Sequence, residues 1–144
     1  MRWALVCLAA CSAPPKPRPR PAAVEQVTPA LPDVPFAQLD DKQREQFMHD
    51  VVVPAMRPIF ASHVSDFRCR TCHGPSADGG DYRMPNPDLP RLDFHDLSPF
   101  KQADIDWMMK DVKPAMAKLL RMPEMSREVP DGFGCESCHV EIAR

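Results

Sequence analysis

The placement of cysteine constrains this chain more than any other feature of its sequence. Four of the six cysteines fall into two C-x-x-C-H units, at residues 69–73 and 135–139. The other two, Cys7 and Cys11, lie within the first eleven residues. Every cysteine therefore belongs to one of these patterns, and none is left over for a disulfide bond between distant parts of a folded domain.

The C-x-x-C-H unit is the attachment sequence of c-type haem. Its two thiols can form thioethers with the two vinyl groups of one porphyrin, and the histidine directly after the second thiol can bind the iron. We therefore expect two covalently bound haems c. The residues expected to hold them are Cys69, Cys72 and His73 for the first haem, and Cys135, Cys138 and His139 for the second.

The composition agrees with a domain built around large cofactors. The chain has 144 residues, 18 of them proline, and only seven Phe, two Trp and one Tyr. Side chains alone give such a chain little apolar bulk for a core. Two porphyrins would supply the missing interior.

Two other chemistries also use paired cysteines. Two C-x-x-C pairs can give four thiolates to a structural zinc ion. Here the pairs lie farther apart than the roughly 15 to 20 residues typical of a zinc ribbon, and zinc does not require a histidine after each pair. A redox-active C-x-x-C pair is expected within a thioredoxin-like strand and helix pattern, which the flanking sequences lack. A zinc-stapled structural lipoprotein remains an alternative.

The first 35 residues predict an export signal and a spacer. Residues 1–10 carry Arg2 followed by a short apolar run, which is typical of a signal peptide. Leu-Ala-Ala-Cys at 8–11 resembles the lipobox of bacterial lipoproteins, which implies a lipid anchor at Cys11. An ordinary signal peptide is the alternative. Residues 11–35, which begin with the lipidated cysteine, are rich in proline and predict an extended linker.

Residues 36–144 are expected to form one small domain with an internal repeat. Each half, about 38–75 and 97–144, has a helical segment before its C-x-x-C-H unit. Apolar residues recur at helical spacing in both halves, and the alternation of period two that marks strands is absent. We expect a mainly α fold, a dihaem cytochrome c domain built from two helix–turn–CxxCH repeats with long irregular loops.

Local signals predict where the two helices begin and how they are interrupted. Asp40 with Gln43 is a capping pair for the first helix, and Ser98 followed by Pro99 predicts the start of the second. A proline lies inside each helical pattern and predicts a bend there. Between the halves, residues 74–97 are rich in Pro, Gly and Asp and predict an irregular loop.

Each haem iron needs a sixth ligand if it is to be low-spin, and methionine is a common choice in electron-transfer cytochromes. Met56 and Met116 occupy the same position in the two halves, so they are our candidates. A methionine on a helix face can equally be core filler. The alternative methionines are Met84, Met122 and Met125, and the alternative histidines are His49, His63 and His95.

The order of a helix bearing Met56, a turn and a C-x-x-C-H unit resembles the haem-binding segments of the cytochrome subunit of photosynthetic reaction centres. In that multihaem family the helix donates the methionine and the following unit donates the histidine. The resemblance covers residues 40–73 and 98–139, and it implies Met56 with His73 and Met116 with His139. The chain departs from the family in having two haem units, not four, and a longer turn before the second unit.

These features together predict an electron-transfer protein and not an enzyme. Its expected partners are redox proteins and, through the N-terminal anchor, the lipid membrane, on the periplasmic side of a bacterial envelope as an outer-membrane lipoprotein. The alternative is a haem enzyme or sensor that binds peroxide, O2 or NO at one open iron position. The globular part is acidic on balance, within a net charge of −2 for the chain, which argues against nucleic-acid binding.

Overall fold

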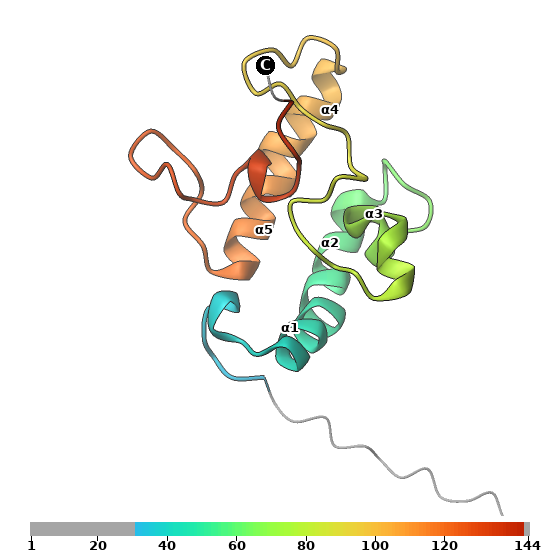
Figure 1. The fold of residues 1–144 in the computed structure, drawn as a ribbon, viewed down its shortest axis with the longest axis vertical. Helices are drawn as coiled ribbons and strands as arrows, with labels where there is room; N and C mark the ends of the chain where they lie inside the picture. Colours follow the sequence, from blue (N-terminus) through green and yellow to red (C-terminus); the bar gives the residue numbers. More distant parts are fainter. Residues whose placement is uncertain (1–30, 143–144) are drawn as a thin grey trace, which may run out of the picture.

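Two long helices lie side by side, and irregular segments join and cover them (Figure 1). This computed structural model describes residues 31–142, so the expected signal peptide, the lipid anchor at Cys11 and residues 11–30 of the linker lie outside the described residues. The helical elements are the 3-10 helix Phe36–Gln38, α1 (Asp41–Phe47), a π-helical segment (Met48–Val52), α2 (Val53–Phe60), α3 (Cys69–His73), the 3-10 helix Pro75–Gly79, α4 (Gln102–Trp107), a second π-helical segment (Met108–Val112), α5 (Lys113–Leu120) and the 3-10 helix Cys135–Ser137.

The fold is mainly helical, as the sequence predicted. Within residues 31–142 the chain forms isolated β-bridges and no strand. In the same range, no helix is both long enough and apolar enough to cross a bilayer.

The first long helix, formed by α1, the first π-helical segment and α2, begins where the sequence predicted. The Asp40 side chain accepts a hydrogen bond from the Gln43 backbone N–H at 2.9 Å, and the Gln43 side chain accepts one from the Asp40 N–H at 3.0 Å. This reciprocal pair satisfies two backbone donors that the first turn of a helix leaves without partners.

The second long helix, formed by α4, the second π-helical segment and α5, begins later than predicted. Ser98 does not start it, because the Ser98 backbone N–H donates to the Asp96 side chain at 3.0 Å in a preceding turn. The chain turns once more before the helix starts at Gln102. The prediction at Ser98 and Pro99 was therefore wrong, since an aspartate-stabilised turn uses these residues.

Each long helix accommodates its proline through a π-helical segment. The N–H of Val53, just before Pro54, donates to the Met48 carbonyl five residues back, and Lys113 before Pro114 donates to Met108 in the same way. Proline has no N–H, and its ring clashes with the carbonyl four residues back in an α-helix. The wider turn relieves that clash. The sequence predicted a bend at these prolines, and the structure has a matching π turn in both helices.

The long helices pack where these π turns occur. Helix α5 contacts the first π-helical segment, and α2 contacts the second. One buried cluster consists of Val52, Met56 and Phe60 on the first helix. A second is formed by Ala117 and Leu120 of the second helix together with Phe133 from the C-terminal segment.

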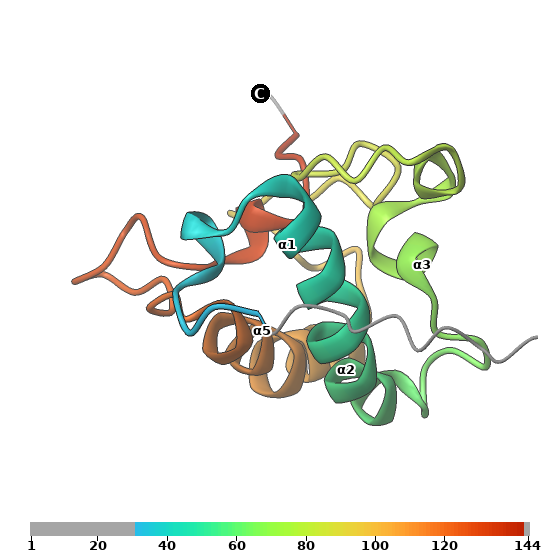
Figure 2. The ribbon, with the colours of Figure 1, turned by 90° about the horizontal axis from the view of Figure 1, so that it is seen from below.

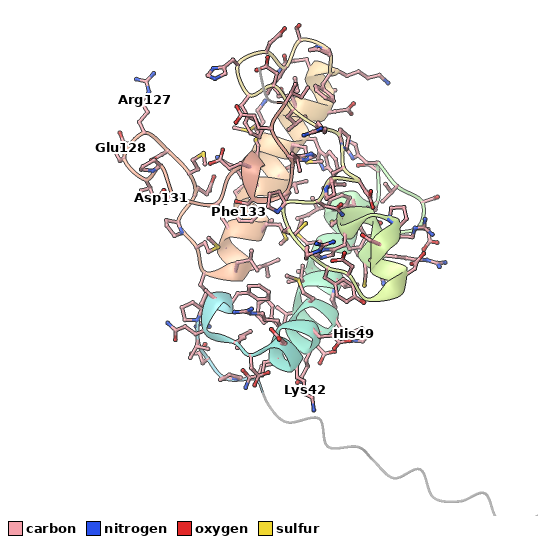
Figure 3. All side chains as sticks on the ribbon, in the orientation of Figure 1. Lys42, His49, Arg127, Glu128, Asp131 and Phe133 are labelled. Atoms are coloured by element: carbon pink, nitrogen blue, oxygen red, sulfur yellow. The ribbon has the colours of Figure 1, made fainter. Side chains whose placement is uncertain are left out.

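Two irregular segments complete the fold. The segment between the halves has only the short 3-10 helix Pro75–Gly79 as regular structure before residue 97, which agrees with the predicted loop. After α5 a second loop leaves the helices, with Arg127, Glu128 and Asp131 along it, and it returns at Phe133 (Figure 3). Helix α3 lies to one side of the pair of long helices when the molecule is seen from below (Figure 2).

Candidate functional site

The first C-x-x-C-H unit folds as a single helical turn, α3. Residues three and four apart share one face of an α-helix. Cys69, Cys72 and His73 therefore project from the same face of α3, with the first cysteine exposed and the second half-buried. This is the arrangement that attachment of one porphyrin through two thioethers and an axial imidazole requires.

The second unit is a tighter and less regular turn. Cys135–Ser137 forms a 3-10 helix, and the His139 N–H then donates to the Cys135 carbonyl at 2.8 Å. This bond between residues four apart brings the histidine back beside the first cysteine of its unit. The two units thus reach a similar local arrangement through different turns.

A hydroxyl side chain closes both turns. Thr71 Oγ1 accepts a hydrogen bond from the Arg68 backbone N–H at 3.0 Å, and Ser137 Oγ accepts one from the Gly134 N–H at 3.0 Å. Both hydroxyls occupy the second x position of C-x-x-C-H. Sequence reasoning passed over these residues, although their equivalent positions in the two units were a signal for this role.

The two histidines differ in their surroundings. His139 Nδ1 lies 2.9 Å from the Pro90 carbonyl. A carbonyl can only accept, so Nδ1 carries the proton and Nε2 is left free to bind a metal. Within residues 31–142, His73 Nδ1 is buried and has no hydrogen-bond partner, and the His73 ring meets Tyr82 edge-on with centroids 5.4 Å apart. Burial lowers the pKa of His73, which favours the neutral imidazole that binds metals.

The second thiol of each unit is held in its neutral form. Burial, with smaller contributions from the nearby Cys138 and Cys69, raises the pKa of Cys72 to about 12. Burial and the Cys135 thiol raise the pKa of Cys138 to about 11.

The structure brings the two units together through the segment between the halves. Asn86 donates its backbone N–H to the Cys138 carbonyl at 2.9 Å, and its side-chain Nδ2 lies 3.5 Å from the Cys72 carbonyl. In Figure 1 this yellow segment passes between α3 and the red C-terminal turn. No feature of the sequence predicted this contact, because an asparagine in a proline-rich loop usually marks only a turn.

The two helix methionines predicted as iron ligands, Met56 and Met116, lie in or against the buried clusters beside the two units. Met56 is 2% exposed and belongs to the cluster against which Cys72 packs. Met116 is half-buried and packs against the cluster that Cys138 also contacts. Each helix methionine thus shares a cluster with the second cysteine of its own half. This placement fits both an iron ligand and a core residue.

The three alternative methionines are placed differently from one another. Met84 and Met122 are 37% and 36% exposed. The Met125 side chain packs on Gly134, where a Cβ would lie 2.8 Å from its sulfur. Because Gly134 directly precedes Cys135, Met125 lies beside the second unit, and it is therefore a candidate ligand there as Met116 is.

The three alternative histidines are exposed. His49 Nδ1 lies 2.7 Å from Asp50, on the side of the first long helix away from the second (Figure 3). His63 stacks on Trp107 with ring centroids 3.7 Å apart. His95 lies in a turn where its backbone N–H donates to Asp93. His63 thus serves to join the two long helices.

The residues present fit a c-type haem at each unit. The fit rests on the two thiols and one imidazole that each unit brings together, and on the bond from His139 Nδ1 to Pro90, which leaves Nε2 for a metal. In residues 31–142, no group of three or more His, Cys, Asp and Glu side chains is arranged to hold a bare metal ion. No family model, curated protein or solved structure matches this chain.

Proposed function

We propose that this protein is a dihaem c-type cytochrome that transfers electrons. The observation that carries the proposal is the pair of C-x-x-C-H turns, each with two thiols and an imidazole grouped together and each set against its own long helix. A bound haem c supplies one-electron exchange between ferric and ferrous iron. The protein's part would be to hold each group covalently, to orient the histidine imidazole and to exclude water.

Particular residues of the chain would fix the attachment turns, orient the histidine and exclude water. Thr71 and Ser137 fix the attachment turns. The Pro90 carbonyl orients the His139 ring by accepting a hydrogen bond from its Nδ1–H. Such a bond at the ring nitrogen that does not bind the metal makes an imidazole a stronger ligand. The apolar clusters under Cys72 and Cys138 would keep the groups dry on the protein side.

We further propose that the protein is a lipoprotein of the periplasmic side of the envelope, anchored at Cys11. The lipobox-like segment and the proline-rich linker that follows it support this proposal. A tether of this kind would let the haem domain meet soluble or membrane-bound redox partners near the membrane surface.

The ligand assignment is tested with a methionine exchange that preserves volume. Met56→Leu should cost less than about 1.5 kcal/mol in stability, yet it removes the thioether. We expect the protein, matured with haem, to keep two haems and to lose the low-spin methionine-ligated spectrum of one. Met48→Leu, a half-buried change on the same helix, is the matched control and should leave the spectrum unchanged. An unchanged spectrum in Met56→Leu would make Met56 a core residue only.

The second haem is tested in the same way with Met116→Leu and Met125→Leu. One of these changes should alter the reduced spectrum of the second haem, and the other should not. A high-spin second haem in the unaltered protein would instead favour the haem enzyme or sensor, because its iron would then have an open position for a small ligand.

A further inference from the structure

Asn86 stands out because it is buried and polar. Among residues 31–142 it is the one polar residue that is buried, with 2% of its surface exposed. A buried amide costs free energy unless its polar atoms find partners. The partners of Asn86 therefore indicate why the residue lies there.

Its partners belong to both C-x-x-C-H units. The backbone N–H donates to the Cys138 carbonyl at 2.9 Å, and side-chain Nδ2 lies 3.5 Å from the Cys72 carbonyl. Side-chain Oδ1 accepts from the Asp88 N–H at 2.8 Å, which fixes the turn that carries the residue. One residue, through its backbone and its side chain, thus contacts two units that are more than 60 positions apart in the sequence.

The chain around Asn86 strengthens the same connection. On the side of the first unit, a Cβ at Gly74 would lie 2.6 Å from Asp88 Cβ and 3.0 Å from Asn86 Nδ2, so the Gly74 backbone packs directly on these two side chains without room for a side chain of its own. On the side of the second unit, Pro90 accepts from His139, and the Leu92 N–H donates to the Val140 carbonyl at 3.1 Å. Segment 86–92 therefore lies against both units along its length.

We propose that Asn86 is a positioning residue that holds the two C-x-x-C-H units, and so the two haems of the proposed function, in one fixed arrangement. The statement about the two haems rests on the proposed function, whereas the contacts of Asn86 with the two units do not. Electron exchange between two redox centres depends steeply on their separation, so a fixed arrangement would make the pair act as one relay. A carboxylate in place of the amide would face the Cys72 carbonyl with an oxygen and not a donor, which explains the need for asparagine.

The test compares Asn86→Ala and Asn86→Asp with Ser98→Ala, an exposed change in the same inter-half segment. All are made in the full chain matured with haem. Amide hydrogen exchange is measured in residues 84–92 and 138–142, and potentiometric titration gives the shift in the potential of one haem when the other is reduced. Asn86→Asp keeps the bond to the Asp88 N–H, so it remains informative if Asn86→Ala does not fold.

We expect both Asn86 variants to keep two haems, to exchange about tenfold faster or more in the two segments and to show a smaller interaction between the haem potentials. Ser98→Ala should match the unaltered protein. Faster exchange with an unchanged redox interaction would make Asn86 purely structural and overturn the proposal, as would unchanged exchange. A chain without haem would overturn the proposed function, while the exchange comparison would still decide whether Asn86 joins the two units.

Discussion

Replacing Gly74 with alanine tests how closely the first C-x-x-C-H unit packs on the segment between the halves. Gly74 has φ +65° and ψ −173°, a conformation that is essentially reserved for glycine and costs other residues about 1–3 kcal/mol. The new Cβ would also lie 2.6 Å from Asp88 Cβ, and overpacking of this kind costs a further 1–3 kcal/mol or so. We therefore expect Gly74→Ala to lower the free energy of unfolding by about 2–6 kcal/mol.

Two neighbouring glycines provide graded controls. Gly80 has φ +82° but no atom within 4 Å of a Cβ, so Gly80→Ala should cost only the backbone term of about 1–2 kcal/mol. Gly79 has neither a positive φ nor a close neighbour, so Gly79→Ala should stay within about 0.5 kcal/mol of the unaltered protein. Urea unfolding followed by circular dichroism measures all three. The reasoning fails if Gly74→Ala is no less stable than Gly80→Ala.

Three further predictions concern the helix start, the helix contact and the thiols. Asp40→Ala removes the capping bond to Gln43 and should cost about 1 kcal/mol of stability in the same assay; no loss would contradict the cap. Trp107→Phe keeps an aromatic side chain but loses the 3.2 Å hydrogen bond from Nε1 to the Ile59 carbonyl and part of the ring that stacks on His63, so it should cost at least about 1 kcal/mol, and an unchanged urea midpoint would count against that bond. In the full chain without haem at pH 8, a pKa of about 12 leaves about one Cys72 in ten thousand as thiolate. Iodoacetamide should therefore modify Cys72 far more slowly than the exposed Cys69, as judged by peptide mapping, and equal rates would contradict the burial of Cys72.

Features set by neighbouring residues could be predicted from the sequence. The Asp40 and Gln43 cap forms within four residues, and the helical periodicity of each half was enough to predict a mainly helical fold. The predicted helix start at Ser98 was wrong because a helix-start signal and a turn signal compete there. Asp96 accepts the Ser98 N–H in a turn, and the sequence contains no simple measure of which signal prevails.

Features set by distant contacts could not be predicted. The bond between His139 and Pro90 joins residues 49 apart, and the contact between Asn86 and Cys72 joins residues 14 apart. The π turns depend on which backbone hydrogen bonds form around Pro54 and Pro114, where the sequence predicted a bend but not its form.

For the candidate site, the sequence identified the residue types but not their environments. The C-x-x-C-H spacing implied the grouping of thiols and imidazole that α3 has. It could not rank the methionines, because their burial depends on tertiary packing. Met56 is enclosed, Met122 is exposed and Met125 lies against Gly134.

The central claim is that the chain carries two covalent haems. The most direct test is to express the full chain with a c-type maturation system, remove non-covalent haem with acidic solvent and count haem per chain by alkaline pyridine haemochrome. Removing both cysteines of the first unit, with Cys69→Ala and Cys72→Ala, should leave one haem, as should removing both of the second. Two haems in the unaltered chain and one in each double variant is the predicted result. No covalent haem, with one zinc ion bound per chain instead, would contradict the account.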